Sequence, residues 1–338
     1  MSAVESATAT AAPPAGQLAA RELLTRFLSG SGVEIGPGHV PFPLPFGGAS
    51  VRYVDRWQPE DNRSLFPELG EAAAGFVIPD VVADLDTDRL SALASESQDF
   101  VIASHVLEHL AEPLGQLADI HRVLRPGGVA LILLPDRRQT FDRDRSPTPL
   151  QHLVEEHRQG VTAVADDHVE DFLRGTGGWD DAWDEAQRRE VLELHRRRSV
   201  HVHTWSQDEF CEVLEHTVRE MGMRWELLDA VFLGDAPGSI EFGMALRRAP
   251  DGADLHLLAA RLGAAWAALA ERARAAREAG AVHEQLVARF GELSAVAEGH
   301  RLAAADARAR LSRLASLPGY GLARRLYRLQ RRLRRGAR

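Results

Sequence analysis

Short apolar runs alternate with helix-like stretches over the first 135 residues of the chain. Each run is only a few residues long, as expected of a strand. The runs cover residues 33–35, 51–54, 81–83, 100–103 and 129–134. Strands that alternate with helices predict a parallel sheet with helices packed on it.

Two helices stand out in this region by the spacing of their apolar residues. The first spans residues 17–28 and ends at Ser29-Gly30-Ser31-Gly32. The second spans residues 113–124 and ends at Pro126-Gly127-Gly128. Residues 1–16, mostly Ala, Thr, Ser and Pro without periodicity, are predicted to be disordered.

The pattern changes after the fifth apolar run. Residues 136–205 are polar, rich in Arg, Asp and His, and contain no clean strand, so we interpret them as an insertion that covers the substrate side. Ser206 and Glu209 then form a capping box that opens a helix. Two further apolar runs, 225–233 and 240–246, have a short connection and predict an antiparallel hairpin. The predicted domain therefore covers residues 17–250, and this insertion lies within it.

The rest of the chain is helical by its pattern. Residues 254–317 carry apolar residues at spacings of three and four, typical of a helical hairpin or a coiled coil. Pro318-Gly319 interrupts this pattern. Residues 318–338 form an arginine-rich amphipathic tail, the last of the predicted segments.

Composition and charge limit the class of protein. The 338 residues are 45% hydrophobic, without an apolar run of transmembrane length or an N-terminal signal pattern. Cys211 is the single cysteine, which excludes an internal disulfide and favours a reducing compartment, so we expect a cytoplasmic protein. The net charge is −9, yet eleven arginines and no acid follow Asp306. The basic tail is therefore a separate element on an acidic chain.

The most informative motif is Glu34-Ile35-Gly36-Pro37-Gly38, after which Asp55 closes the next apolar run. A strand that enters a glycine turn leaves its backbone open to a ligand, and an acid after the following strand can accept both hydroxyls of a ribose. Pro41 replaces the third glycine of a dinucleotide fingerprint, so little supports a bound pyrophosphate. The turn therefore favours a nucleoside cofactor without phosphates, of which S-adenosylmethionine is the common one.

Two further motifs follow strands. Asp84 and Leu85 come directly after the third run, and Ser104-His105-Val106-Leu107-Glu108-His109 follows the fourth. With the glycine turn, the strand-end acid and an Arg-Pro-Gly-Gly turn, residues 20–250 resemble the class I S-adenosylmethionine-dependent methyltransferases, and most of all their small-molecule branch. The resemblance implies an α/β, Rossmann-like, seven-stranded and mostly parallel sheet with an antiparallel hairpin end, here with a C-terminal helical extension.

The resemblance also implies which residues bind the cofactor. Glu34, Gly36, Pro37 and Gly38 would surround its methionine part, Asp55 would take the ribose hydroxyls, Asp84 and Leu85 would frame the adenine, and Ser104 and His105 would lie beneath the sulfonium. The proline-rich stretch 41–45 departs from the family's smooth helix start. It can reshape the amino-acid end of the pocket.

Methyl transfer also needs an aligned acceptor and a base. Among many histidines, His105 and His152 are our first choices as catalytic residues. The spacing of His201 and His203 would put both on one face of an extended segment, where with Glu108 they could hold a divalent metal, although we favour no metal. The alternative for each histidine is a structural role. The arginines within residues 137–145 could grip an anionic substrate group or form ion pairs that hold the insertion.

The leading prediction is therefore a methyltransferase acting on a small polar acceptor, such as a sugar or glycan hydroxyl. The continuation Pro135-Asp136-Arg137-Arg138, with Thr140-Phe141-Asp142 after it, resembles that of methyltransferases from bacterial polysaccharide and secondary-metabolite pathways. The alternative is a non-catalytic methyltransferase-like scaffold that acts through its helical C-terminus. RNA methylation is disfavoured because the domain is acidic and no Asn/Asp-Pro-Pro-aromatic motif follows the fourth strand.

The tail offers a second, independent contact. Its leucines share one helical face with arginines around it, namely Leu322, Leu326, Leu329 and Leu333. Such a helix can lie on an anionic membrane, so a peripheral membrane contact is one expectation. It can equally dock on the acidic domain of its own chain or of a second copy in a homo-oligomer. Nucleic acid is disfavoured, since Tyr320 and Tyr327 are the tail's only aromatic residues.

Overall fold

The computed structural model describes residues 15–44, 48–232, 239–279 and 289. Contacts divide the chain into two units, residues 1–276 and 277–338. Of the second unit, only residues 277–279 and 289 are described, and they are helical. Most of the predicted disordered N-terminus, most of the predicted helical hairpin and the whole arginine-rich tail therefore lie outside the described residues.

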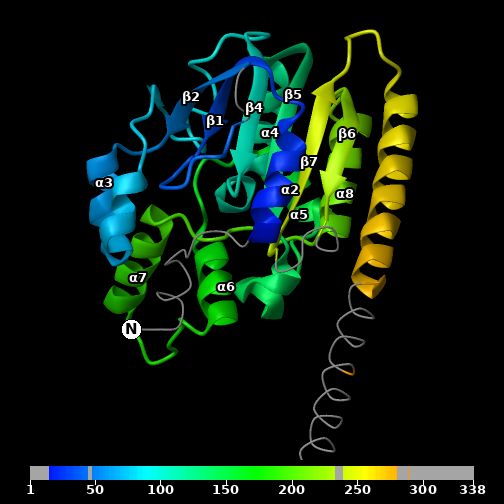
Figure 1. Cartoon of the computed structure of the whole chain (residues 1–338). Coiled ribbons are helices and arrows are strands. Elements are labelled where there is room, and N and C mark those ends of the chain that lie inside the picture. The colour runs from blue at the N-terminus through cyan, green and yellow to red at the C-terminus, as the bar shows by residue number, and fades with distance from the viewer. Residues whose placement is uncertain (1–14, 45–47, 233–238, 280–288, 290–338) are drawn as a thin grey trace, which may run out of the picture. The chain divides into compact units, whose positions relative to one another are not determined.

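One sheet with the strand order β3-β2-β1-β4-β5-β7-β6 forms the centre of the first unit (Figure 1). The strands are β1 (Gly30–Ile35), β2 (Ala49–Asp55), β3 (Val81–Val82), β4 (Gln98–Ser104), β5 (Leu124–Pro135), β6 (Trp225–Val231) and β7 (Glu241–Arg248). The first five strands pair in parallel, whereas β7 is antiparallel to both β5 and β6. The predicted Rossmann-like α/β sheet with an antiparallel end is confirmed.

Helices connect the strands. They are α2 (Ala15–Thr25), α3 (Pro59–Leu65), η1 (Pro67–Gly75), η2 (Leu107–His109), α4 (Pro113–Val123), η3 (Arg137–Gln139), η4 (Phe141–Asp144), α5 (Leu150–Gln159), α6 (Asp166–Thr176), α7 (Glu185–Arg197) and α8 (Gln207–Arg219). Residues 255–276 of the first unit are also helical. The predicted capping box is present at the start of α8, where Ser206 and Glu209 bond each other's backbone.

The centre of the sheet, formed by β4, β5 and β7, is buried on both faces. Side chains alternate along β4, so Val101 and Ala103 join one apolar cluster while Phe100 and Ile102 join the other. Helices α4, α8 and the helix from residue 255 contribute to the first cluster, and α2 contributes to the second (Figure 1). A strand with both faces covered is apolar throughout, which explains the continuous runs in the sequence.

Three local features differ from the pattern or were missed by it. The Arg-Pro-Gly-Gly segment is not a turn ahead of β5 but part of that strand. Leu124 already pairs with Gln98, and residues 125–128, of which 125–127 are exposed and Gly128 is buried, bulge out before pairing resumes at Val129. Gly127 allows this bulge with a φ of +88°. The helical segments α3 and η1 after β2 were not predicted. The insertion is helical, with α6 and α7 around a small apolar cluster of their own.

Within the described ranges, no helix combines the length and the apolar composition needed to cross a bilayer.

Candidate active site

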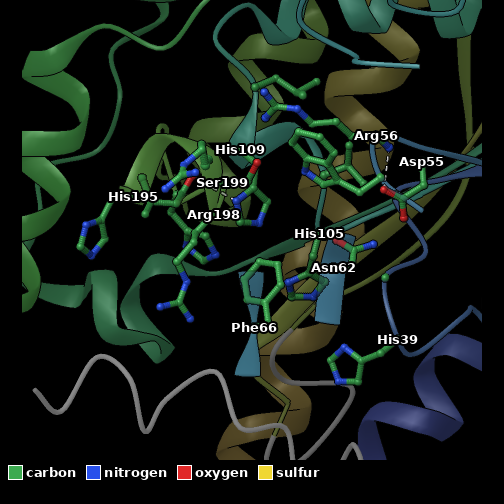
Figure 2. Close-up of a pocket in the computed structure, with 18 of the residues that line it drawn as sticks. His39, Asp55, Arg56, Asn62, Phe66, His105, His109, His195, Arg198 and Ser199 are labelled. Atoms are coloured by element: carbon green, nitrogen blue, oxygen red, sulfur yellow. Dashed lines mark hydrogen bonds between the residues drawn. The ribbon is translucent and has the colours of Figure 1, made fainter. Parts of the chain in front are cut away.

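A cavity of about 810 Å³ lies at the carboxyl ends of β1, β2 and β4 (Figure 2). Parallel strands end at the same edge of a sheet, so the loops that follow them meet there. Those loops form one side of the cavity, and residues of η4, α6, α7 and the segment 198–201 form the other. All eight residues predicted to bind the cofactor line this cavity, and so does His105.

The turn after β1 depends on two glycines. Gly36 and Gly38 have φ values of +59° and +56°, where a residue with a Cβ is strained. A Cβ on Gly36 would lie 2.9 Å from Cγ2 of Val106, whereas a Cβ on Gly38 would meet no atom within 4 Å. The Gly36 N–H donates to the Val54 carbonyl at 2.9 Å, which ties the turn to β2. The backbone of the turn is therefore held open to the cavity.

Glu34 is a buried carboxylate at the end of β1. Its Oε1 accepts the Phe42 N–H at 2.9 Å, but its Oε2 has no hydrogen-bond partner among the described residues. Burial raises the pKa of Glu34 to about 7. Since Glu34 also lines the cavity, it offers an unused acceptor to a ligand there.

Asp55 ends β2 and faces the same cavity (Figure 2). One carboxylate oxygen accepts the Arg56 N–H at 2.6 Å, which fixes the carboxylate group. Burial raises the pKa of Asp55 against the lowering effect of backbone N–H groups. Asp55 is half-buried, so water competes less for its carboxylate than at the surface, which favours a hydrogen bond to a ligand hydroxyl.

The loop after β3 supplies three acidic or apolar residues, Asp84, Leu85 and Asp86, to the cavity. Asp84 is paired with Arg56, with 2.9 Å between its Oδ2 and the guanidinium Nε. Asp86 was not predicted from the sequence. Its Oδ1 accepts the Ala111 N–H at 2.8 Å, and burial raises its pKa to about 6.

His105 follows β4 with a φ of +55°, a strained value for a residue with a side chain. Its Nε2 lies 2.7 Å from Oε2 of Glu241, and Glu241 in turn accepts two hydrogen bonds from Arg21, at 2.8 and 2.7 Å. Burial lowers the pKa of His105, but the hydrogen bond with Glu241 and the charges of Glu241 and Glu108 outweigh it and raise the pKa overall. Burial alone would raise the pKa of Glu241, whereas Arg21 and His105 bring it to about 2.

A second histidine–carboxylate pair stands on the insertion side. Nδ1 of His201 lies 2.6 Å from Oδ2 of Asp142, whose Oδ1 accepts from Arg145 at 2.7 Å. Asp142 is only 1% exposed, and the pKa of its carboxyl is lowered because the His201 and Arg145 contacts outweigh burial. His201 lines the cavity and packs against the rings of His109 and Phe141.

Glu108 and His109 contact these pairs, and His109 also lines the cavity. Glu108 is 1% exposed, neither of its oxygens makes a hydrogen bond with a described residue, and burial raises its pKa. Its Oε1 lies 3.5 Å from Nδ1 of His105 and 3.9 Å from Nε2 of His109. Burial lowers the pKa of His109 to about 3. With His201, these two residues have ligand atoms within 4.8 Å of one another, so this group could hold a metal ion.

His152 does not line the cavity. It lies on α5 in a separate group with His168 and His203. The predicted meeting of His201 and His203 at one point is wrong, because the N–H groups of Val202 and His203 both donate to the Glu108 carbonyl and bend the backbone there. A bend breaks the two-residue alternation of an extended segment.

The arginine cluster is engaged in ion pairs. Arg137 pairs with Glu209, Arg138 with Asp136, Arg143 with Asp144, and Arg145 with Asp142 and Asp171. None of these four arginines is among the residues that line the cavity. Of the two roles predicted for these arginines, ion pairing within the insertion is the one that matches their contacts.

The strand order, the glycine turn and the strand-end acid at the edge of the sheet define a class I S-adenosylmethionine-dependent methyltransferase domain. Residues 33–132 match the family model of a methyltransferase domain. The chain therefore contains such a domain, and its cofactor is S-adenosylmethionine. The unpartnered Glu34 oxygen, the half-buried Asp55 carboxylate and the open space beside Gly38 fit that molecule, which carries an ammonium group and ribose hydroxyls.

Several solved structures are similar at low sequence identity. The CurJ carbon methyltransferase is 16% identical, with 66% of this chain and 49% of that chain covered and a TM-score of 0.35. A 1,6-didemethyltoxoflavin-N1-methyltransferase of Burkholderia thailandensis is 16% identical, with 70% and 79% covered and a TM-score of 0.38. A Haloferax volcanii complex of the Trm112 activator and a methyltransferase is 12% identical, with 70% and 91% covered and a TM-score of 0.39. The chain thus spans about half the length of the first of these. No curated protein matches the sequence.

Proposed function

We propose that this chain transfers the methyl group of S-adenosylmethionine to a hydroxyl of a small polar acceptor, such as a sugar or a glycan unit. When bound, S-adenosylmethionine supplies an electrophilic methyl carbon on a positively charged sulfur. The residues of the chain must orient both molecules and receive the hydroxyl proton. The observation that supports the proposal is the presence of two histidine–carboxylate pairs whose histidines, His105 and His201, line the cavity.

The Asp142–His201 pair has the arrangement of a general base. An alcohol is a weak acid, so a base must take its proton as the new carbon–oxygen bond forms. Asp142 accepts the Nδ1–H of His201 and so selects the tautomer whose Nε2 carries a lone pair. Nε2 of His201 would take the hydroxyl proton as the acceptor oxygen receives the methyl group that the cofactor supplies. Arg145 fixes the other Asp142 oxygen, which keeps the imidazole oriented.

We assign His105 a different role. Its raised pKa favours the protonated ring, held between Glu241 and Glu108. A protonated ring is a poor base but a good hydrogen-bond donor. Its Nε2 is taken up by Glu241, so Nδ1, which makes no hydrogen bond with Glu108 at 3.5 Å, would position an acceptor oxygen beside the cofactor. This role agrees with its place directly after Ser104 at the end of β4.

The lining of the cavity suits an acceptor with one apolar face and a polar edge. Several aromatic side chains contribute to it, among them Phe66, Phe141 and Trp183. Asn62 and Ser199 add hydrogen-bonding groups (Figure 2). Pockets of this kind use apolar walls for affinity and a few polar groups for orientation, and a sugar ring offers both surfaces.

Two measurements test the proposal. Calorimetric titration with S-adenosylmethionine tests the cofactor, and transfer of a labelled methyl group to panels of matched alcohols, amines and carbon acids tests the acceptor class. We expect label on a hydroxyl, with at least a hundredfold loss of turnover in His201→Asn. His256→Asn, which changes an exposed histidine far along the chain, is the control. Binding without labelled alcohol, or label on nitrogen only, would contradict the acceptor class, and absent binding would contradict the enzyme itself.

A further inference from the structure

A second group of histidines lies in the insertion, outside the lining of the cavity. His152 and Glu156 are four residues apart on α5 and so share a helical face, and His168 stands in the first turn of α6. His203 comes from the segment between α7 and α8. Three separate pieces of the chain thus direct imidazole and carboxylate groups to one place.

The ligand atoms lie close enough together for one metal ion to reach them. Nε2 of His152 and Nε2 of His168 are 3.2 Å apart, and Oε1 of Glu156 lies 3.1 and 2.8 Å from them. Atoms with these separations can all lie ~2.0–2.2 Å from one point, the usual distance of zinc from nitrogen and oxygen ligands. In a tetrahedral site at that distance, neighbouring ligands are ~3.3 Å apart.

His203 supplies the fourth side chain and the strongest single indication. It is fully buried, with 0% of its surface exposed, and its ring nitrogens make no hydrogen bond with a described side chain, the Ala111 backbone being a polar neighbour of the ring. Its Nε2 lies 3.5 Å from Oε2 of Glu156, which also has no hydrogen-bond partner among those residues. Buried polar groups without partners are rare and costly, whereas a metal ion would take one lone pair from Nε2 of His203 and one from the Glu156 carboxylate.

We propose that His152, Glu156, His168 and His203 bind a divalent transition-metal ion, with Zn²⁺ as the expected occupant. Four ligands made up of imidazole nitrogens and a carboxylate oxygen are typical of zinc, which is not redox-active and so suits a structural site. The ion joins α5, α6 and the segment after α7. It is a structural site, since its ligands do not line the cavity.

The position of the site links it to the cavity. His203 is two residues from His201, and Val200 and His201 both line the cavity. A metal ion that fastens His203 to α5 and α6 therefore also fixes the segment that carries these lining residues. The site goes beyond the proposed function, because metal binding and its effect on stability can be measured without any methyl acceptor.

The test uses the full-length chain with any polyhistidine tag removed. Elemental analysis after dialysis should find about one zinc per chain, and His168→Gln and His152→Gln should lower this to near zero. His157→Gln is the matched control, because His157 lies on the same helix, has the same 39% side-chain exposure as His152 and pairs instead with Glu112. It should retain the metal.

Two further readouts keep the proposal falsifiable if a variant folds poorly. Removal of the ion from the unmodified chain should lower its melting temperature, and Zn²⁺ should restore it. Co²⁺ added to the metal-free chain should give the visible bands of a four-coordinate site, absent in His168→Gln. A folded chain that binds neither ion would overturn the proposal. So would a metal that is lost in His201→Asn yet kept in His168→Gln, because the ion would then belong to the group around Glu108.

Discussion

Adding a single methyl group at Gly36 should destabilise the domain more than the same change at Gly38. Both glycines have nearly the same positive φ, so alanine at either position costs about 1–2 kcal/mol for the left-handed backbone. Only at Gly36 does the new Cβ meet a neighbour, Cγ2 of Val106 at 2.9 Å. Overpacking of this kind adds about 1–3 kcal/mol. The expected free-energy losses are therefore about 1–2 kcal/mol for Gly38→Ala and about 2–5 kcal/mol for Gly36→Ala.

A double-mutant cycle identifies the clash as the cause. Val106→Ala removes both side-chain methyl groups that face the turn, and by itself it destabilises the core because Val106 is buried. Combined with Gly36→Ala it should recover about 1–3 kcal/mol relative to the sum of the single changes. Combined with Gly38→Ala it should recover nothing, because no atom lies near that Cβ.

Urea unfolding followed by tryptophan fluorescence, without cofactor, measures these differences at a common denaturant slope. Cofactor is omitted because binding to the folded state would mask part of the loss. Equal losses at the two glycines, or an absent coupling between Gly36 and Val106, would refute the reasoning. The backbone cost alone would then explain both substitutions.

Three other changes test the site. Asp55→Ala should weaken S-adenosylmethionine binding at least tenfold in calorimetry, since two charge-assisted hydrogen bonds to the ribose are lost, with the melting temperature of the free chain nearly unchanged. Asp142→Asn should lower kcat about a hundredfold or more, with little change in KM for S-adenosylmethionine, because His201 loses its tautomer; a loss confined to KM would contradict this role. The pKa of Glu34 is raised from 4.5 to about 7, so the folded state holds this proton more tightly than the unfolded state. The protonation of Glu34 therefore stabilises the folded state fully below pH 4.5, and this stabilisation is lost as the pH rises to about 7. In Glu34→Gln, the free energy of unfolding of the cofactor-free chain should depend less on pH over this interval.

The fold was predictable because most of its signals are local. Each buried strand is a continuous apolar run, and the glycine turn and Asp55 lie within 22 residues of one another, on paired strands. The placement of β7 between β5 and β6 has no such local signal, since it depends on pairing across more than 100 residues. The bulge at residues 125–128 was not predicted for a related reason. Its glycines are typical of a turn, and only the pairing of Leu124 with Gln98 shows that the segment belongs to β5.

The acceptor side was harder to predict. His105 could be placed in the cavity because it follows directly from β4, but its partner Glu241 is 136 residues away. His152 was chosen as one histidine among many on polar helices, and no helical pattern tells which face of α5 turns towards the cavity. A better signal was available in α5 itself, where His152 and Glu156 share a face and so suggest a common ligand.

The contact between Arg21 and Glu241 also has a consequence for synthesis of the protein. These residues are 220 positions apart, so the support of His105 is completed only when the last strand of the sheet has left the ribosome. The cofactor turn needs only β1, β2 and β4, all of which precede residue 105. A nascent chain can therefore form the cofactor turn early, while the contacts of His105 with Glu241 and Arg21 are still missing. Contacts between residues this far apart in the sequence form slowly during folding. Methyl transfer then becomes available only to a chain whose first unit is nearly complete.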